Sequence, residues 1–203
     1  MVLSLLVVMI LHPLQILRDL KAEAETWCRG RLWWARLPLL AWFAWILIHA
    51  WGDPLYQPLF KGLDLGIHEL GHYLFKPFGR FLEILGGSLT QCLAPLLSMV
   101  MFRRQGDFFA ISVCFGWLSA NLFDVATYAG DARAMDLPLV RPGGGEVIHD
   151  WNYLLGHMGM LHQDATVAFL MRAAATLSML VCLAGGAWLT WRMFRNSGSG
   201  HGG

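Results

Sequence analysis

The chain has 203 residues, of which 56% are apolar and only 14% are charged, and its net charge is +1. Globular domains carry about 25% charged residues, so this composition lacks the polar surface of a water-soluble domain. The balanced charge, without a basic stripe, excludes a nucleic-acid-binding protein, and the apolar content excludes a disordered chain. We therefore expect an all-α, polytopic integral membrane protein, a helical bundle with about four to six membrane segments.

The first predicted element, Met1–Leu17, is apolar but short, so it is either a tilted span or an interfacial helix. A polar linker follows, with five Lys or Arg residues between Arg18 and Arg36. Leu37–Trp51, extended back to Leu32, is long enough to cross a hydrocarbon core of about 30 Å. Pro58–Phe78 is predicted to form a less hydrophobic helix that Pro77 and Gly79 end.

The apolar segment Phe81–Phe102 contains Gly86-Gly87 and Pro95, which predicts a kinked or broken helix. Gly86-Gly87-Ser88 and Gln91 could pair with an extended substrate, although close helix packing through small residues is the favoured interpretation. The remaining segments are a span at Phe108–Gly130, a polar loop at Asp131–Ile148, a short helix at Asp150–Leu161 with Asp150 as N-cap, and a span at Ala165–Trp191.

We expect residues 1–195 to form one membrane-embedded domain and residues 196–203 a flexible tail. Arg172 lies near one end of the last span, where its guanidinium can reach the interface. The basic linker favours a cytoplasmic location for residues 18–36, and Arg192 and Arg195 favour the same side. Whether both preferences can be met depends on the number of crossings, so the orientation in a cytoplasmic (inner) membrane stays open.

The most informative motif is His68-Glu69-Leu70-Gly71-His72 on a predicted helix. Residues four apart share one helix face, so the two imidazoles can bind one Zn²⁺. Glu69 projects beside them and can act as general base toward a water that the zinc activates. Such a pattern also arises by chance among core histidines, but ionisable residues in an apolar helix are costly and are functional by default. We therefore expect a zinc site with one further protein ligand.

The stretch from Gly66 to His72, in an apolar helix of a multi-span chain, resembles the site-2 protease family of intramembrane zinc metalloproteases. In that family an Asn-Leu pair, a Pro-containing turn and a helix-starting Asp-Gly follow two spans later, and the Asp is the third zinc ligand. Here Asn121-Leu122, Leu137-Pro138-Leu139 and His149-Asp150-Trp151 follow in that order, with a loop inserted and Asp150-Trp151 in place of Asp-Gly. The resemblance implies a zinc metallopeptidase that cleaves membrane-protein or peptide substrates in or near the lipid bilayer.

Three residues are candidates for the third zinc ligand. Asp150 ranks first because it begins a helix and its carboxylate is a suitable ligand, although helix capping alone would explain an Asp there. His149 ranks second because zinc enzymes also use three histidines. Asp131 ranks third, since Arg133 two residues later could be its salt-bridge partner.

Two polar residues, Asn121 and Asp124, lie inside a predicted span. Asn121 could act in catalysis by hydrogen bonding to the substrate backbone or the developing oxyanion, as the resemblance implies. Asp124 could orient a ligand histidine. Alternatively, the two residues form ordinary hydrogen bonds between helices.

Two other classes of function remain open. A metal-binding membrane scaffold or transporter subunit would need the histidines but not Glu69. A His-box membrane oxidoreductase would need several histidine clusters, whereas only His68 and His72 have suitable spacing.

Overall fold

The computed structural model describes residues 2–59, 61–138 and 148–198. These residues form α-helices and short 3₁₀ turns without strands, so the all-α prediction is confirmed. The α-helices are α1 (Val2–Trp27), α2 (Leu37–Gly52), α3 (Lys61–Phe75), α4 (Arg80–Gln105), α5 (Phe108–Gly130), α6 (Asp150–His157) and α7 (Asp164–Gly198).

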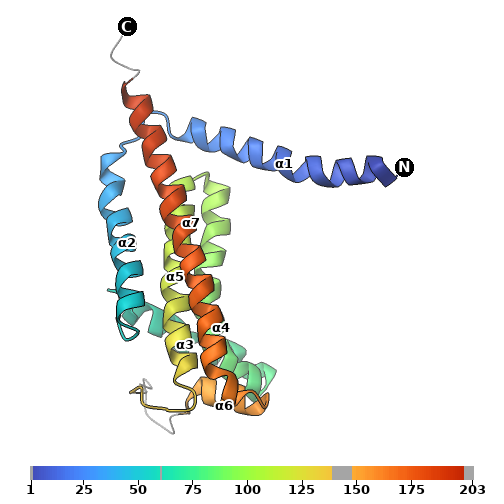
Figure 1. Cartoon of the computed structure of the whole chain (residues 1–203), viewed down its shortest axis with the longest axis vertical. Coiled ribbons are helices and arrows are strands. Elements are labelled where there is room, and N and C mark those ends of the chain that lie inside the picture. Colours follow the sequence, from blue (N-terminus) through green and yellow to red (C-terminus); the bar gives the residue numbers. More distant parts are fainter. Residues whose placement is uncertain (1, 60, 139–147, 199–203) are drawn as a thin grey trace.

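Four segments in the described part of the chain are long and apolar enough to cross a membrane: Trp34–Gly52, Arg80–Gln105, Phe108–Gly130 and Leu161–Ser197. They contain α2, α4, α5 and α7, which run side by side (Figure 1). Helix α5 is the most enclosed of the four, because half of its apolar window is buried. The described residues therefore form a membrane-type helical bundle with four helices that could cross a bilayer.

The two ends of the bundle differ in what they carry. Figure 1 shows α3 and α6 together at one end, while α1 extends away from the other end of the bundle. The second half of α1 is attached to the bundle by ion pairs of Glu23 with Arg103 and of Glu25 with Arg192. This geometry favours the interfacial alternative for the first helix over the tilted span.

Helix α4 continues through Pro95 and is not broken there, contrary to one of the two expected outcomes. Pro95 lacks an N–H, which leaves the carbonyl group of Gln91 without its usual helical donor. The Asn121 side chain supplies the missing bond, because its Nδ2 donates to the Gln91 carbonyl at 2.7 Å. A donor from α5 thus compensates for the proline inside α4.

Several boundaries differ from the expected ones. Helix α6 ends at His157, and its N-cap is His149, not Asp150. Helix α7 continues to Gly198, three residues into the expected tail, and residues 199–203 lie outside the described part. The Arg172 guanidinium is directed across the bundle, where it donates to the Ala50 carbonyl at 3.0 Å and to Thr127 Oγ1 at 3.1 Å.

Helix α3 has its polar face inside and its apolar face outside. Asp64 and His68 are buried, whereas Leu63, Leu70 and Leu74 are 61%, 52% and 53% exposed. A helix in water shows the opposite arrangement. In a membrane the ionisable residues face the protein interior, so this pattern indicates that the outer face of α3 contacts lipid.

Three glycines allow α3 and α4 to pack with their backbones in close contact. Close helix packing is the favoured interpretation of Gly86-Gly87 in the sequence. A Cβ atom added at Gly71 would lie 2.2 Å from the Gly86 carbonyl oxygen. One added at Gly86 would lie 2.6 Å from the Gly71 oxygen, and one at Gly87 would lie 2.5 Å from His68 Nε2. Small residues permit such close approach of helices in membranes.

We predict that Gly71→Ala lowers the thermal stability of the detergent-purified protein, because the new methyl group forces α3 away from α4. Overpacking of this kind costs about 1–3 kcal/mol. Gly66→Ala is the matched control, since a Cβ there meets no atom within 4 Å. Thermal unfolding of both variants measures the difference, and equal stability would contradict the close contact.

Candidate metal centre

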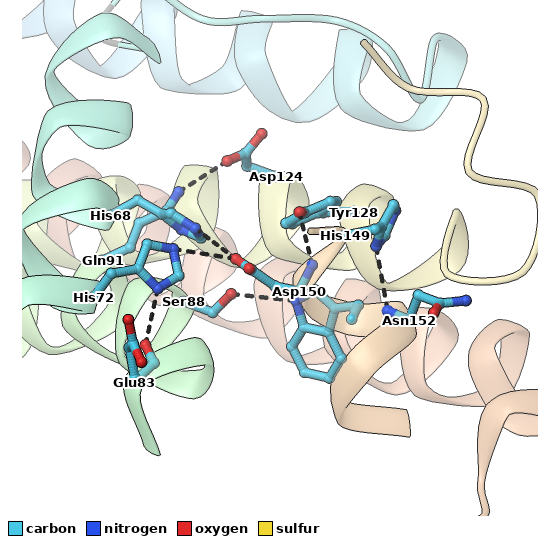
Figure 2. Close-up of polar contacts among 11 residues, drawn as sticks. His68, His72, Glu83, Ser88, Gln91, Asp124, Tyr128, His149, Asp150 and Asn152 are labelled. Atoms are coloured by element: carbon cyan, nitrogen blue, oxygen red, sulfur yellow. Dashed lines mark hydrogen bonds and ion pairs between the residues drawn. The ribbon is translucent and has the colours of Figure 1, made fainter. Parts of the chain in front are cut away.

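Three side chains from two distant segments meet at the end of the bundle that carries α3 and α6. Asp150 Oδ2 lies 3.0 Å from His68 Nε2 and 3.3 Å from His72 Nε2. One ligand atom from each residue lies within 4.8 Å of the others (Figure 2). Ligand atoms about 2.0–2.1 Å from a tetrahedral zinc ion are roughly 3.4 Å apart, so the group has the dimensions of a three-ligand metal site.

The hydrogen bonds of Gln91 define which nitrogen of His68 carries the proton. Gln91 Nε2 donates to Asp124 Oδ2 at 2.9 Å, and this carboxylate oxygen can only accept. Gln91 Oε1 therefore faces His68 Nδ1 at 3.1 Å, and Nδ1 must donate. The lone pair of neutral His68 is then on Nε2, which faces Asp150.

His72 is oriented in the same way by the backbone of α4. Its Nδ1 lies 2.8 Å from the carbonyl oxygen of Glu83, which can only accept a hydrogen bond. In the neutral imidazole the Nε2 lone pair then faces Asp150 as well. Histidines that bind metals commonly donate their other ring N–H to a carbonyl or carboxylate group in this manner.

Three acceptor atoms consequently converge on one point. Two imidazole lone pairs and a carboxylate oxygen repel one another unless a cation lies among them, either a proton on the imidazoles or a metal ion. Burial favours the neutral acid, but when protons lie on the imidazoles, the hydrogen bonds from His68 and His72 outweigh it and hold the pKa of Asp150 below its usual value. The donor set of two histidines and one carboxylate is one that zinc enzymes use.

The two lower-ranked candidates for the third ligand, His149 and Asp131, are engaged elsewhere. His149 Nδ1 accepts from the Asn152 N–H at 3.2 Å and so caps α6, while its Nε2 lies 3.1 Å from Asp131 Oδ2. Although burial acts to raise the pKa of Asp131, backbone N–H groups of Asp136 and Leu137 and the bond from His149 hold it below its usual value. Because His149 caps the helix, the Asp150 carboxylate is free to face the histidines.

For Asp124 the structure supports the second of the two alternatives, a hydrogen bond between helices, because Gln91 of α4 donates to it. Asp124 does not contact a ligand histidine directly, since Gln91 lies between Asp124 and His68. Its other oxygen is paired with Lys61, so a chain of polar contacts runs from Lys61 through Asp124 and Gln91 to His68.

Asn121 lies beside this chain, but its side chain is fully buried. Its Nδ2 is bonded to the Gln91 carbonyl, and its Oδ1 lies 3.4 Å from Gln91 Nε2. Nor does Asn121 line the cavity that opens beside the three candidate ligands. This placement supports the alternative of a bond between helices over direct contact with a substrate.

A cavity of about 390 Å³ opens beside the three candidate ligands. Glu69 is half-buried and lines this cavity together with His68, His72 and Asp150. The walls of the cavity combine apolar side chains with charged ones from α3, α5 and α7, among them Lys61 and Arg172. A molecule in the cavity would therefore meet Glu69 and the three candidate ligands together.

Other residues anchor α6 and were not among the sequence candidates. The Asp150 N–H donates to the Tyr128 hydroxyl at 3.0 Å, and Trp151 Nε1 donates to Ser88 Oγ at 3.2 Å. These bonds attach the start of α6 to α5 and α4. No spacing in the sequence signals them, because each joins residues from distant segments.

Comparisons of the chain with known protein families, with curated proteins and with solved structures find no match.

We predict that Asp150→Ala strongly reduces the affinity for Zn²⁺, whereas His149→Ala retains the metal and mainly lowers stability through the lost cap, by about 0.5–2 kcal/mol. The measurements are metal analysis and thermal unfolding of purified protein. The exposed His162 provides a control substitution, His162→Ala. Loss of zinc in His149→Ala with zinc retained in Asp150→Ala would reverse the assignment of the third ligand.

We predict that Gln91→Met weakens zinc binding by about 10–100-fold, the usual effect of removing a hydrogen bond to a ligand histidine. Titration against a chelator measures the affinity. Ser98→Ala, also on α4, removes only a local bond to the Ala94 carbonyl and serves as control. Unchanged zinc affinity in folded Gln91→Met protein would show that His68 does not depend on this orientation.

Proposed function

We propose that this protein is an intramembrane zinc metallopeptidase that cleaves peptide bonds in or near the lipid bilayer. The observation that carries the proposal is the convergence of His68 Nε2, His72 Nε2 and Asp150 Oδ2, which all face one point as acceptors. Glu69 lines the cavity beside these three residues. This combination matches the sequence resemblance to site-2 proteases.

The donor set fits zinc as a resident cofactor. Two imidazole nitrogens and one carboxylate oxygen leave a fourth tetrahedral position for water or substrate, as in catalytic zinc sites. When bound, zinc supplies a Lewis acid and lowers the pKa of a coordinated water to about 7. The negative charge of Asp150 offsets part of the metal's charge, which matters in a site shielded from solvent.

Glu69 is proposed as the general base. It is adjacent to His68 in the sequence but is not one of the three converging residues, so its carboxylate is available to accept a proton. Hydrolysis requires this proton to move from water to the leaving amine, and a carboxylate at the cavity wall can accept and then return it.

The surroundings of the site favour a membrane-associated substrate. The outer face of α3 exposes leucines, whereas the inner face carries the candidate ligands. The cavity therefore lies between a lipid-facing helix and the bundle. A polypeptide segment at the membrane surface or within one leaflet can reach it without crossing the whole bilayer.

The two alternative classes have weaker support. Among the described residues only one group of His, Cys, Asp or Glu side chains has metal-binding geometry, and it provides too few ligands for the two irons of a His-box oxidoreductase. A scaffold or transporter subunit needs no general base, so the contribution of Glu69 separates that class from a peptidase.

We predict that Glu69→Gln retains the fold and zinc but abolishes peptide-bond hydrolysis, because the amide cannot accept the proton. The variant also serves as a trap: crosslinking in membranes followed by mass spectrometry is expected to recover a membrane-associated polypeptide. The matched control is Glu83→Gln, which leaves the Glu83 backbone carbonyl at His72 in place. Full hydrolysis by Glu69→Gln, or recovery of lipids alone, would contradict the peptidase assignment and favour the scaffold.

A further inference from the structure

The basic residues of this chain are concentrated at the end of the bundle opposite the candidate metal centre. Nine of the 15 Lys and Arg residues belong to the second half of α1, the linker to α2, the α4–α5 connection and the end of α7. They are Arg18, Lys21, Arg29, Arg31, Arg36, Arg103, Arg104, Arg192 and Arg195. Because the four spans run side by side, these segments meet at one end of the bundle (Figure 1).

The difference in positive charge between the two ends of the bundle increases when ion pairs are considered. Of the nine basic residues, only Arg103 and Arg192 pair with carboxylates of described residues. At the other end, three of the five described Lys and Arg residues are paired with a carboxylate. Those three are Lys61, Arg80 and Arg133, whose partners are Asp124, Glu83 and Asp164. Among the described residues, seven cations without a carboxylate partner thus lie at the basic end and two at the end with the metal centre.

Aromatic rings surround the basic end, as expected at a membrane–water interface. The Arg31 guanidinium lies 4.1 Å from the centre of the Trp27 ring, and that of Arg195 lies 5.1 Å from the centre of the Trp191 ring. Helix α1 extends sideways away from this end of the bundle (Figure 1). These features indicate that the end lies at the headgroup level of one membrane surface.

We infer that the basic end faces the cytoplasm and that the metal centre opens on the opposite side of the membrane. Connections rich in Lys and Arg are retained on the cytoplasmic side. With four crossings, residues 28–36, residues 103–107 and the end of α7 share that side, so the preferences of the linker and of Arg192 and Arg195 are met together. The nine residues of the basic end are then all retained on one side, against six Lys and Arg residues in the rest of the chain.

This orientation also specifies the class of substrate. The substrate class rests on the proposed function, whereas the orientation itself does not. A peptidase centre on the side away from the cytoplasm acts on polypeptides that have crossed the membrane or are anchored in its outer leaflet. Cytoplasmic proteins and segments in the cytoplasmic leaflet are excluded as substrates.

Thiol labelling of the full chain in bacterial spheroplasts tests the orientation. His162→Cys reports the metal-centre end and Gln105→Cys the basic end, and both replace exposed residues. The wild-type chain gives the background, since three native cysteines are buried and Cys92 is half-buried. With a membrane-impermeant maleimide, we expect several-fold stronger labelling of His162→Cys than of Gln105→Cys, and equal labelling after detergent treatment.

Stronger labelling of Gln105→Cys, or equal labelling of both variants before detergent treatment, would overturn the inference. If a cysteine variant does not fold, reporters fused after Gly203 provide a second measurement. A green fluorescent protein fusion should fluoresce and an alkaline phosphatase fusion should be inactive, whereas an active phosphatase would overturn the orientation. Neither readout requires zinc or hydrolysis, so failure of the orientation and failure of the peptidase assignment are distinguishable.

Discussion

The close contact between α3 and α4 is the constraint on which the candidate site depends. Gly71 and Gly86 place the two backbones so near each other that a single methyl group would not fit between them. At this distance Gln91 reaches His68, and the Glu83 carbonyl reaches His72. Both imidazoles are therefore oriented by α4, whereas α3 provides their positions. If α4 were further away, the rings would rotate freely and their lone pairs would not converge.

The same polar contacts explain how a membrane bundle tolerates ionisable groups. Ionisable residues inside a bilayer are costly unless they are paired and hydrogen-bonded. Lys61 pairs with Asp124, and Gln91 connects Asp124 to His68. Pro95, which would leave a backbone acceptor unsatisfied, is compensated by Asn121. Polar groups of α3, α4 and α5 thus satisfy one another, and the lipid-facing surface of α3 remains apolar.

Hydropathy and spacing predict the spans and the histidine pair well, because both depend on neighbours along the chain. The order of segments also directs attention to Asp150, since a helix start after the polar loop can return to the site. The role of Gln91 is not predictable in this way, because it depends on which turn of α4 faces α3. For the same reason the sequence favours Asp150 as the helix cap, whereas His149 takes that position and leaves the carboxylate free. The sequence shows Asn121 only as a polar residue in a span. Its partner is the Gln91 carbonyl that Pro95 leaves without a donor, and this partner is evident only once the helices are packed.

The length of α3 accounts for the position of the site at one end of the bundle. A helix of 15 residues is about 22 Å long, shorter than a hydrocarbon core of about 30 Å. It can therefore line one leaflet but cannot cross both. Lys61 and Asp124, which line the same cavity as the histidines, retain side-chain exposures of 30% and 28%. Solvent thus reaches the polar side of the cavity while the leucines of α3 face lipid, and a hydrolytic centre requires both, because water must meet a substrate held at the membrane.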